Sequence, residues 1–117
     1  TMATTDKDKR IKAEVTKMKK VFSELDNEKK KDIVNNLIDN MSFMTITLQD
    51  LQQMINESGC VEEYQNGENQ RGYKESTAVR VYNNLIKNYN SVVKLALDQL
   101  GANTSEDDAL AAFMMKR

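Results

Sequence analysis

Histidine and tryptophan are both absent from this chain of 117 residues, and cysteine occurs once, as Cys60. Without histidine, the chain lacks the commonest general base and the commonest metal-binding side chain of proteins. A single cysteine can form neither an intramolecular disulfide nor a thiolate metal site. Cys60 follows a glycine at an expected helix end, a position more typical of an inert small residue than of a nucleophile. These absences argue against an enzyme.

Catalytic sequence motifs are missing too. The chain contains no Walker loop, no GxSxG and no GxGxxG sequence. Acidic residues recur at heptad spacing, Asp32 with Asp39 and Asp50 with Glu57, but this spacing is typical of the solvated face of a helix. We expect no catalytic residues, no cofactor and no bound metal, and a carboxylate-dependent metal enzyme is kept only as a third hypothesis.

Long apolar runs are also absent. No segment approaches the roughly 18 apolar residues of a membrane span, and no basic-then-apolar leader is visible, so we expect no membrane contact and a cytoplasmic location. With 39% hydrophobic and 30% charged residues, the composition is that of a soluble, helix-rich single domain. We expect a disordered end over residues 1–6, with Thr1 added ahead of Met2 for expression, one helical domain over 7–101 and a flexible tail over 102–117.

Charge is arranged in blocks, although the formal net charge is only −1. Residues 1–31 hold ten basic and six acidic residues, and residues 32–70 hold seven acidic residues and no basic one. Residues 71–100 are basic again, with five basic and two acidic residues. Such blocks suit head-to-tail contact between copies, with a basic surface left for a polyanion. Ordinary solvated helix faces are the alternative for the basic front.

Apolar residues at steps of three and four predict helices. The first predicted helix, over residues 7–25, is basic and amphipathic, and its apolar positions are Ile11, Val15, Met18, Phe22 and Leu25. Asn27 can cap a second helix over residues 27–58, and Gly59 can end it in a left-handed conformation. That second helix carries an apolar stripe with a strict heptad rhythm.

A third helix is predicted over residues 76–100, with Ser76 or Thr77 as its cap. The expected fold is all-α: two long antiparallel helices joined by a small β-hairpin, preceded by the basic amphipathic helix. Because the two stripes exceed what one pair can bury, we expect a homo-oligomer. Its predicted interface is Met41, Met44, Leu48, Leu51, Tyr82, Leu85, Tyr89 and Val92. A compact three-helix bundle, with the first helix covering the pair, is the alternative.

Residues 61–74 predict a polar β-hairpin between the long helices. Alternating residues lead to Asn66-Gly67, a dipeptide that tolerates the positive φ of a hairpin turn. Asn69, Arg71 and Tyr73 can return opposite Val61, Glu63 and Gln65. The hairpin should project from the end of the pair, where a neighbouring subunit or a nucleic acid could be touched by Tyr64, Arg71, Tyr73 and Lys74. A simple connector is the alternative interpretation.

The segment LQDLQQMINESGCVEEYQNGENQRGYKESTAVRVYNNLIKNYNSVVKLALDQLG, residues 48–101, resembles the core of phage terminase small subunits. The shared outline is a helix ending at glycine, a short extended segment with Asn-Gly, and a helix with spaced Tyr, Leu and Ile ending in Leu-Gly. The phrases EEYQNGENQ and AVRVYNNLIKNY carry most of the resemblance. It implies a non-catalytic DNA-packaging component of a phage or prophage, acting in a bacterial host cell. Proteins of this family form rings, recognise viral DNA and regulate the terminase large subunit.

Basic residues of the first helix are the expected contacts to double-stranded DNA. Phosphate contact by such residues gives affinity with little sequence preference. The predicted set is Lys9, Arg10, Lys12, Lys17, Lys19 and Lys20. The tail offers an apolar face that could fold into a groove of the large subunit, made of Leu110, Phe113 and Met114. The alternative function is a coiled-coil protein-interaction module that never binds nucleic acid. The alternative interpretation of the tail is a frayed chain end.

Overall fold

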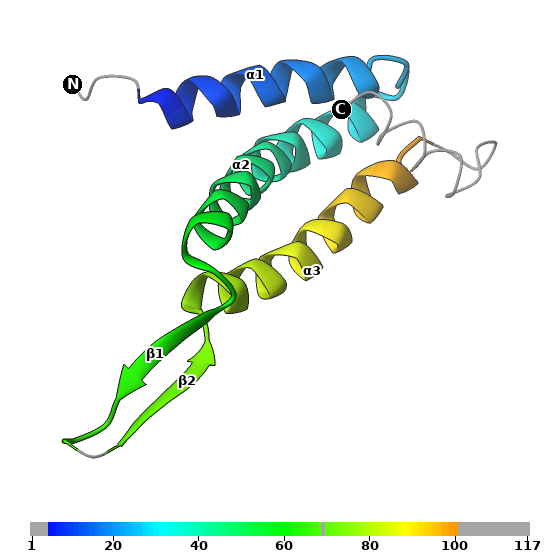
Figure 1. Ribbon diagram of the computed structural model, residues 1–117. Helices are drawn as coiled ribbons and strands as arrows, with labels where there is room; N and C mark the ends of the chain where they lie inside the picture. The colour runs from blue at the N-terminus through cyan, green and yellow to red at the C-terminus, as the bar shows by residue number, and fades with distance from the viewer. Residues whose placement is uncertain (1–4, 69, 101–117) are drawn as a thin grey trace.

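Three helices and a two-stranded ribbon make up the protein, seen here in a computed structural model that describes residues 5–68 and 70–100 (Figure 1). The elements follow in the order α1 (Asp6–Val21), α2 (Glu28–Ser58), β1 (Val61–Gln65), β2 (Arg71–Glu75) and α3 (Thr77–Asp98). The expected fold, mostly helical with a small antiparallel sheet between the two long helices, is therefore confirmed. No helix in the described ranges combines the length and the apolar character needed to cross a membrane.

The helix ends follow the capping residues seen in the sequence. The Asn27 side chain accepts a hydrogen bond of 3.1 Å from the backbone N–H of Lys30, and Ser76 accepts one of 3.1 Å from that of Val79. Both side chains satisfy amide groups that a helix start leaves without a partner. Gly59 ends α2 with a φ of 82°, a backbone conformation that favours glycine. The two predicted N-caps are confirmed, whereas Gly59 ends α2 at the predicted position with a ψ of 178°, outside the left-handed helical region.

The first helix is shorter than predicted. It ends at Val21 rather than at residue 25, because the chain turns there and the Ser23 hydroxyl donates back to the carbonyl of Lys20 at 2.8 Å. Phe22 and Leu25, which the sequence placed on the helix, are still buried, at 5% and 7% exposure. The turn thus brings both side chains onto the core instead of continuing the helix past it.

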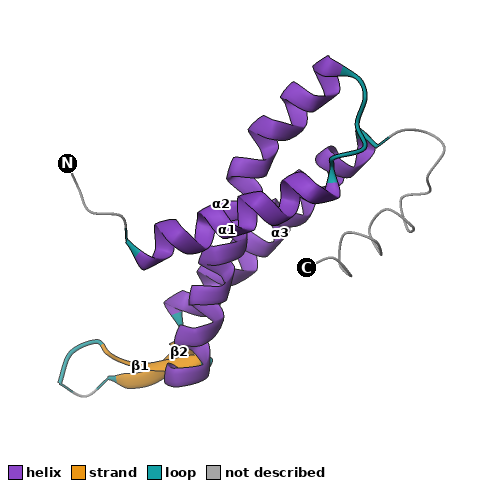
Figure 2. Cartoon of the chain, turned by 90° about the horizontal axis from the view of Figure 1, so that it is seen from above, coloured by secondary structure: helices purple, strands orange, loops and turns teal. Residues whose placement is uncertain are grey.

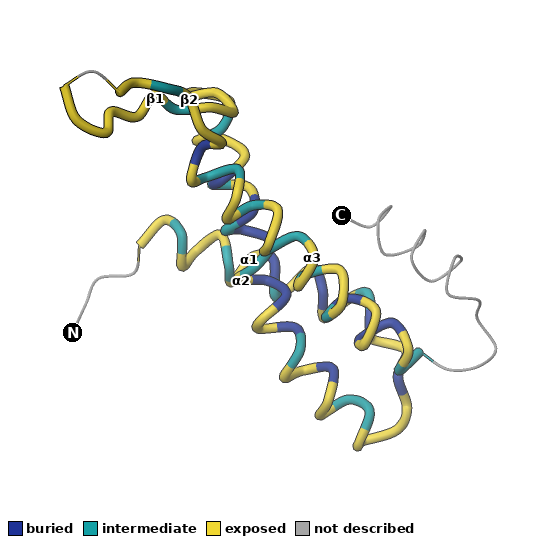
Figure 3. The backbone as a smooth tube through the Cα atoms, turned by 90° about the horizontal axis from the view of Figure 1, so that it is seen from below, coloured by how far each residue is buried: buried dark blue, intermediate teal, exposed yellow. Residues whose placement is uncertain are grey.

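Helices α1 and α3 both pack against α2, on different sides of it (Figures 1 and 2). The largest fully buried side chains include Met18 of α1 and Ile38 and Met41 of α2. The Ser42 hydroxyl lies 3.4 Å from the sulfur of Met18, which fixes the contact between α1 and α2. Buried residues gather where α1, the first half of α2 and the last half of α3 meet (Figure 3). The core is therefore made by three helices.

This core encloses part of the predicted oligomer interface. Met41, Leu48 and Leu51 are buried within one chain, with exposures of 0%, 6% and 8%. Met41 has no exposed surface in this packing, whereas Leu48 still lines a half-open groove between α2 and α3. The remaining predicted interface residues are half-buried and keep part of their surface available: Met44, Tyr82, Leu85, Tyr89 and Val92.

Two isoleucines of α2 test this assignment of the core. Ile38 is 1% exposed and Ile33 is 47% exposed, so Ile38→Ala should lower the free energy of unfolding by about 2–4 kcal/mol and Ile33→Ala by less than about 1 kcal/mol. Urea unfolding at low micromolar protein concentration measures both changes. Equal decreases in the two variants would contradict the packing of α2 described above.

Candidate nucleic-acid and partner surfaces

The basic face of α1 is the main candidate site for a polyanion. Five of the six predicted DNA contacts have exposed side chains that make no ion pair within the described residues: Lys9, Lys12, Lys17, Lys19 and Lys20. Because successive residues turn by about 100°, Lys9 and Lys20 lie on the side of α1 opposite Met18, which is buried against α2. The lysines therefore point to solvent, away from the core.

Lys19 and Lys20 have a structural role besides any contact with DNA. Both lie in the last turn of α1, where a positive charge interacts favourably with the partial negative charge of the helix end, by about 0.3–1 kcal/mol. Lys19 also lines a half-open cavity of about 250 Å³ together with Lys31 of α2. The basic surface thus continues from the end of α1 to the start of α2.

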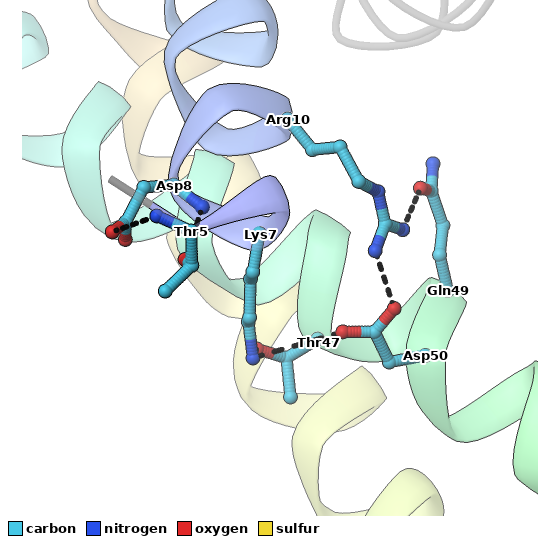
Figure 4. A network of polar contacts seen from close by, with 7 residues as sticks. All are labelled: Thr5, Lys7, Asp8, Arg10, Thr47, Gln49 and Asp50. Carbon is cyan, nitrogen blue, oxygen red and sulfur yellow. Dashed lines mark hydrogen bonds and ion pairs between the residues drawn. The ribbon is translucent and has the colours of Figure 1, made fainter. Parts of the chain in front are cut away.

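Arg10, the sixth predicted DNA contact, is engaged by α2 (Figure 4). Its guanidinium lies 2.6 Å from a carboxylate oxygen of Asp50 and donates to the side-chain oxygen of Gln49 at 3.0 Å. These partners are about 40 residues away in sequence, so no local pattern could reveal them. Arg10 therefore ties the start of α1 to the middle of α2 and is less available to a phosphate than the lysines are.

Lys7 takes part in the same network, although the sequence did not single it out. Its ammonium group donates to the Thr47 hydroxyl at 3.1 Å, lies 3.8 Å from Asp50, and stands 4.9 Å from the centre of the Phe43 ring. The two ion pairs are about 40% exposed, so each contributes on the order of 0.2–1 kcal/mol. The basic front and the acidic middle of the sequence thus complement each other partly within one chain.

The hairpin residues lie on a ribbon that extends beyond the helices (Figure 1). Tyr73 is 76% exposed, opposite Glu63, and Arg71 is exposed opposite Gln65. The strands are joined by residues 66–70, and the turn bond runs from the N–H of Asn66 to the carbonyl of Gln70. Each residue of β1 therefore pairs with a residue two positions later in the chain than predicted, because the turn is longer than the tight turn expected at Asn66-Gly67. Residues 71 and 73 keep the predicted face. Residue 69 lies outside the described residues.

Tyr64 occupies the other face of the ribbon, directly opposite Gly72. A Cβ atom built on Gly72 would lie 2.9 to 3.0 Å from the hydroxyl end of the Tyr64 side chain, so a side chain at residue 72 requires the tyrosine ring to move. Covering a strand glycine with an aromatic ring on the facing strand is a known way of pinning strand register. Tyr64 is therefore a structural residue of the ribbon as well as a half-exposed surface residue.

Lys74 is held by a polar cluster at the base of the ribbon. Its ammonium group lies 3.4 Å from Glu62, and the Thr77 hydroxyl donates to the same carboxylate at 3.2 Å. The hydrogen bond from Thr77, followed by the effects of Lys74, lowers the pKa of Glu62 below its ordinary value. The cluster joins β1, β2 and the start of α3, and any stabilisation from Glu62 is present at neutral pH and lost when acid protonates it.

A half-open groove of about 310 Å³ lies between α2 and α3. Its walls include Leu48, Tyr82, Ile86 and Tyr89, and the amide of Gln52 donates to the Tyr82 hydroxyl at 3.1 Å across it. No carboxylate, lysine or cysteine lines this groove, and the described residues contain no group of three acidic or cysteine residues placed to hold a metal ion.

Comparison with other proteins adds no family to these observations: no family model, no curated protein and no solved structure matches the chain. The predicted tail residues Leu110, Phe113 and Met114 lie outside the described residues. The described structure therefore shows two of the predicted surfaces. One is the projecting ribbon, and the other is the basic face of α1, called the lysine face below and made of Lys9, Lys12, Lys17, Lys19 and Lys20.

A double-mutant cycle at Tyr64 and Gly72 tests the ribbon geometry. Gly72→Ala should displace the tyrosine ring and lower the hydrogen-exchange protection of the ribbon amides by a few fold, less than overpacking of a closed core would, because the 44% exposed ring can move aside. In a Tyr64→Thr background the same Gly72→Ala change should raise protection, because alanine is favoured over glycine in a strand once the ring is gone. Reduced protection in both backgrounds would contradict the close packing of the ring on the glycine.

Proposed function

We propose that this chain is a non-catalytic DNA-packaging protein similar to terminase small subunits, one that self-associates, binds double-stranded DNA and regulates a terminase large subunit. The observation that carries the DNA-binding part is the lysine face of α1, whose five lysines are exposed and free of ion pairs within the described residues. The resemblance of residues 48–101 to that family supports the biological setting.

The length of the lysine face suits contact with a DNA backbone. Lys9 and Lys20 are separated by about 16 Å along α1 at a rise of 1.5 Å per residue. Duplex DNA carries about one phosphate charge per 1.7 Å of its axis, so several phosphates lie within reach of the five side chains. Such contacts give salt-dependent affinity with little sequence preference. The tail of residues 102–117 stays the proposed contact to the large subunit.

A protein-interaction module without nucleic-acid binding is the second candidate function. It is favoured by large apolar side chains that are about half exposed on the long helices, among them Met54 at 52% and Leu95 at 55%. Exposed apolar surface of this kind marks protein contacts more often than DNA contacts. Salt-dependent DNA binding separates the two candidates.

Reversing three lysines tests DNA binding directly. Lys17, Lys19 and Lys20 replaced together by Glu should weaken binding to a duplex of arbitrary sequence at least tenfold at low salt. The slope of log affinity against log salt concentration should become shallower by up to about 0.9 for each phosphate that the variant no longer neutralises. The matched control replaces the same residues by Arg, which keeps the charge and should keep both affinity and slope. If the Glu variant retains its helical circular dichroism and binds DNA like the parent, the lysine face has no role in DNA binding.

Neutralising Asp50 should have the opposite effect. Asp50→Asn removes the carboxylate that holds Arg10 and Lys7, so both cations become available and DNA affinity should rise by a few fold, with a slope steeper by about one or two units. Asp32→Asn is the matched control, because it changes net charge equally at an exposed position of the same helix that makes no ion pair within the described residues. An equal increase in both variants would show a general charge effect and not the release of Arg10 and Lys7.

A further inference from the structure

The half-open cavity at the end of α1 has mainly apolar walls. Phe22 and Leu25 of the turn after α1 line it together with Val34 and Ile38 of α2, and its volume is about 250 Å³. An apolar cavity of about 150 Å³ is already large enough to bind benzene. The cavity therefore has room for the phenyl ring of a phenylalanine side chain.

Positive charge borders this cavity. Lys19 and Lys31 both line it, and Lys19 makes no ion pair within the described residues. The ion pair of Lys31 with Glu28, at 3.6 Å, joins side chains that are 44% and 84% exposed, so it contributes little stability and another carboxylate can replace it. Residues 17–31 hold six basic and three acidic residues. The cavity suits a group that combines an apolar side chain with negative charge.

The described part of the chain ends close to this cavity. Leu100 packs against the core cluster that includes the four apolar residues of the cavity walls. The end of α3 lies at the same end of the molecule as the turn between α1 and α2 (Figures 1 and 2). An extended chain spans at most about 3.6 Å per residue, so the step from residue 100 to residue 106 can cover about 20 Å. That is more than the diameter of a helix, about 10–12 Å, so residue 106 can reach the cavity.

The residues that follow Leu100 have the composition that the cavity suits. Residues 101–117 lie outside the described residues, and their sequence places three acidic residues, Glu106, Asp107 and Asp108, a few positions before Phe113. No basic residue occurs in residues 101–115. Three negative charges therefore match the excess of three positive charges in residues 17–31. We call residues 106–113 the acidic segment.

We propose that the acidic segment docks at this cavity of its own chain, with the Phe113 ring inside the cavity and the carboxylates beside Lys19 and Lys31. The docked segment competes with DNA phosphates for the end of the lysine face at Lys19. Docking itself requires no DNA, and only its effect on DNA affinity rests on the proposed function. A large subunit that binds the tail would release these lysines, so the two binding events would favour each other.

The short connection to α3 favours the same chain over a second copy as the source of the segment. A group joined by a short linker acts at an effective concentration on the order of millimolar. Separate copies at micromolar concentration compete poorly with it. Charge complementarity alone would fit either source, so the connection is the argument for docking within one chain.

Amide chemical shifts in the full chain test the docking. Phe113→Asp places a charge where the ring is buried, so the segment should leave the cavity, and the amide signals of Ser23 and Asn35, which line it, should shift. The amide signal of Gln52, in the groove between α2 and α3, should not shift. Met115→Asp is the matched control, because it makes the same charge change outside the acidic segment. Unchanged signals at Ser23 and Asn35, or equal shifts in both variants, overturn the proposal.

A mixing experiment identifies the chain that supplies the segment. The Phe113→Asp variant is isotope-labelled and mixed with an excess of unlabelled parent. If each chain binds its own segment, the signals of Ser23 and Asn35 in the labelled variant should keep their shifted positions. A return of these signals to the parent positions shows that a second copy supplies the segment, and it overturns docking within one chain.

DNA affinity measures the consequence, and its direction separates docking from charge. Phe113→Asp and Met115→Asp each add one negative charge, which by itself weakens DNA binding. Phe113→Asp should nevertheless raise the affinity for a duplex of arbitrary sequence by about threefold, because it frees Lys19 for a phosphate. Met115→Asp should leave the affinity unchanged or lower it slightly.

The combined results separate this proposal from the proposed function. A Phe113→Asp chain that binds DNA no better than Met115→Asp overturns the competition with DNA. If the amide shifts are as expected but neither the parent nor either variant binds DNA, docking stands, and the competition is wrong together with the proposed DNA binding. If the parent binds DNA but Phe113→Asp leaves the cavity signals unchanged, docking is wrong and DNA binding by the lysine face stands.

Discussion

The fold depends on α2 packing against two helices at once. Ile38, Met41 and Ser42 are at most 1% exposed, because α1 closes one side of them and α3 another. A 16-residue helix such as α1 is marginal in water by itself, and so is a two-stranded ribbon. Both elements therefore rely on the long helices, α1 by packing on α2 and the ribbon by being anchored at its base through Glu62 and Thr77.

Local chemistry made most of the secondary structure predictable. The side chains of Asn27 and Ser76 can cap only a helix that starts within a few residues of them. Gly59 adopts a positive φ that other residues avoid. Such signals are complete within a few residues of sequence. The end of α1 was misplaced because Phe22 and Leu25 have the same apolar character whether they continue a helix or fold over in a turn.

Contacts between distant residues could not be predicted in the same way. Arg10 pairs with Asp50 across 40 residues of sequence. In the sequence, each of the two looks like an ordinary charged residue on the solvated face of a helix, so their pairing could not be predicted. The apolar stripe of α2 was equally ambiguous, since Met41 and Met44 belong to one heptad pattern but one is fully buried within the chain and the other is only half-buried. The periodicity of apolar residues shows which face of a helix packs. It does not show whether that face packs within the chain or against another molecule.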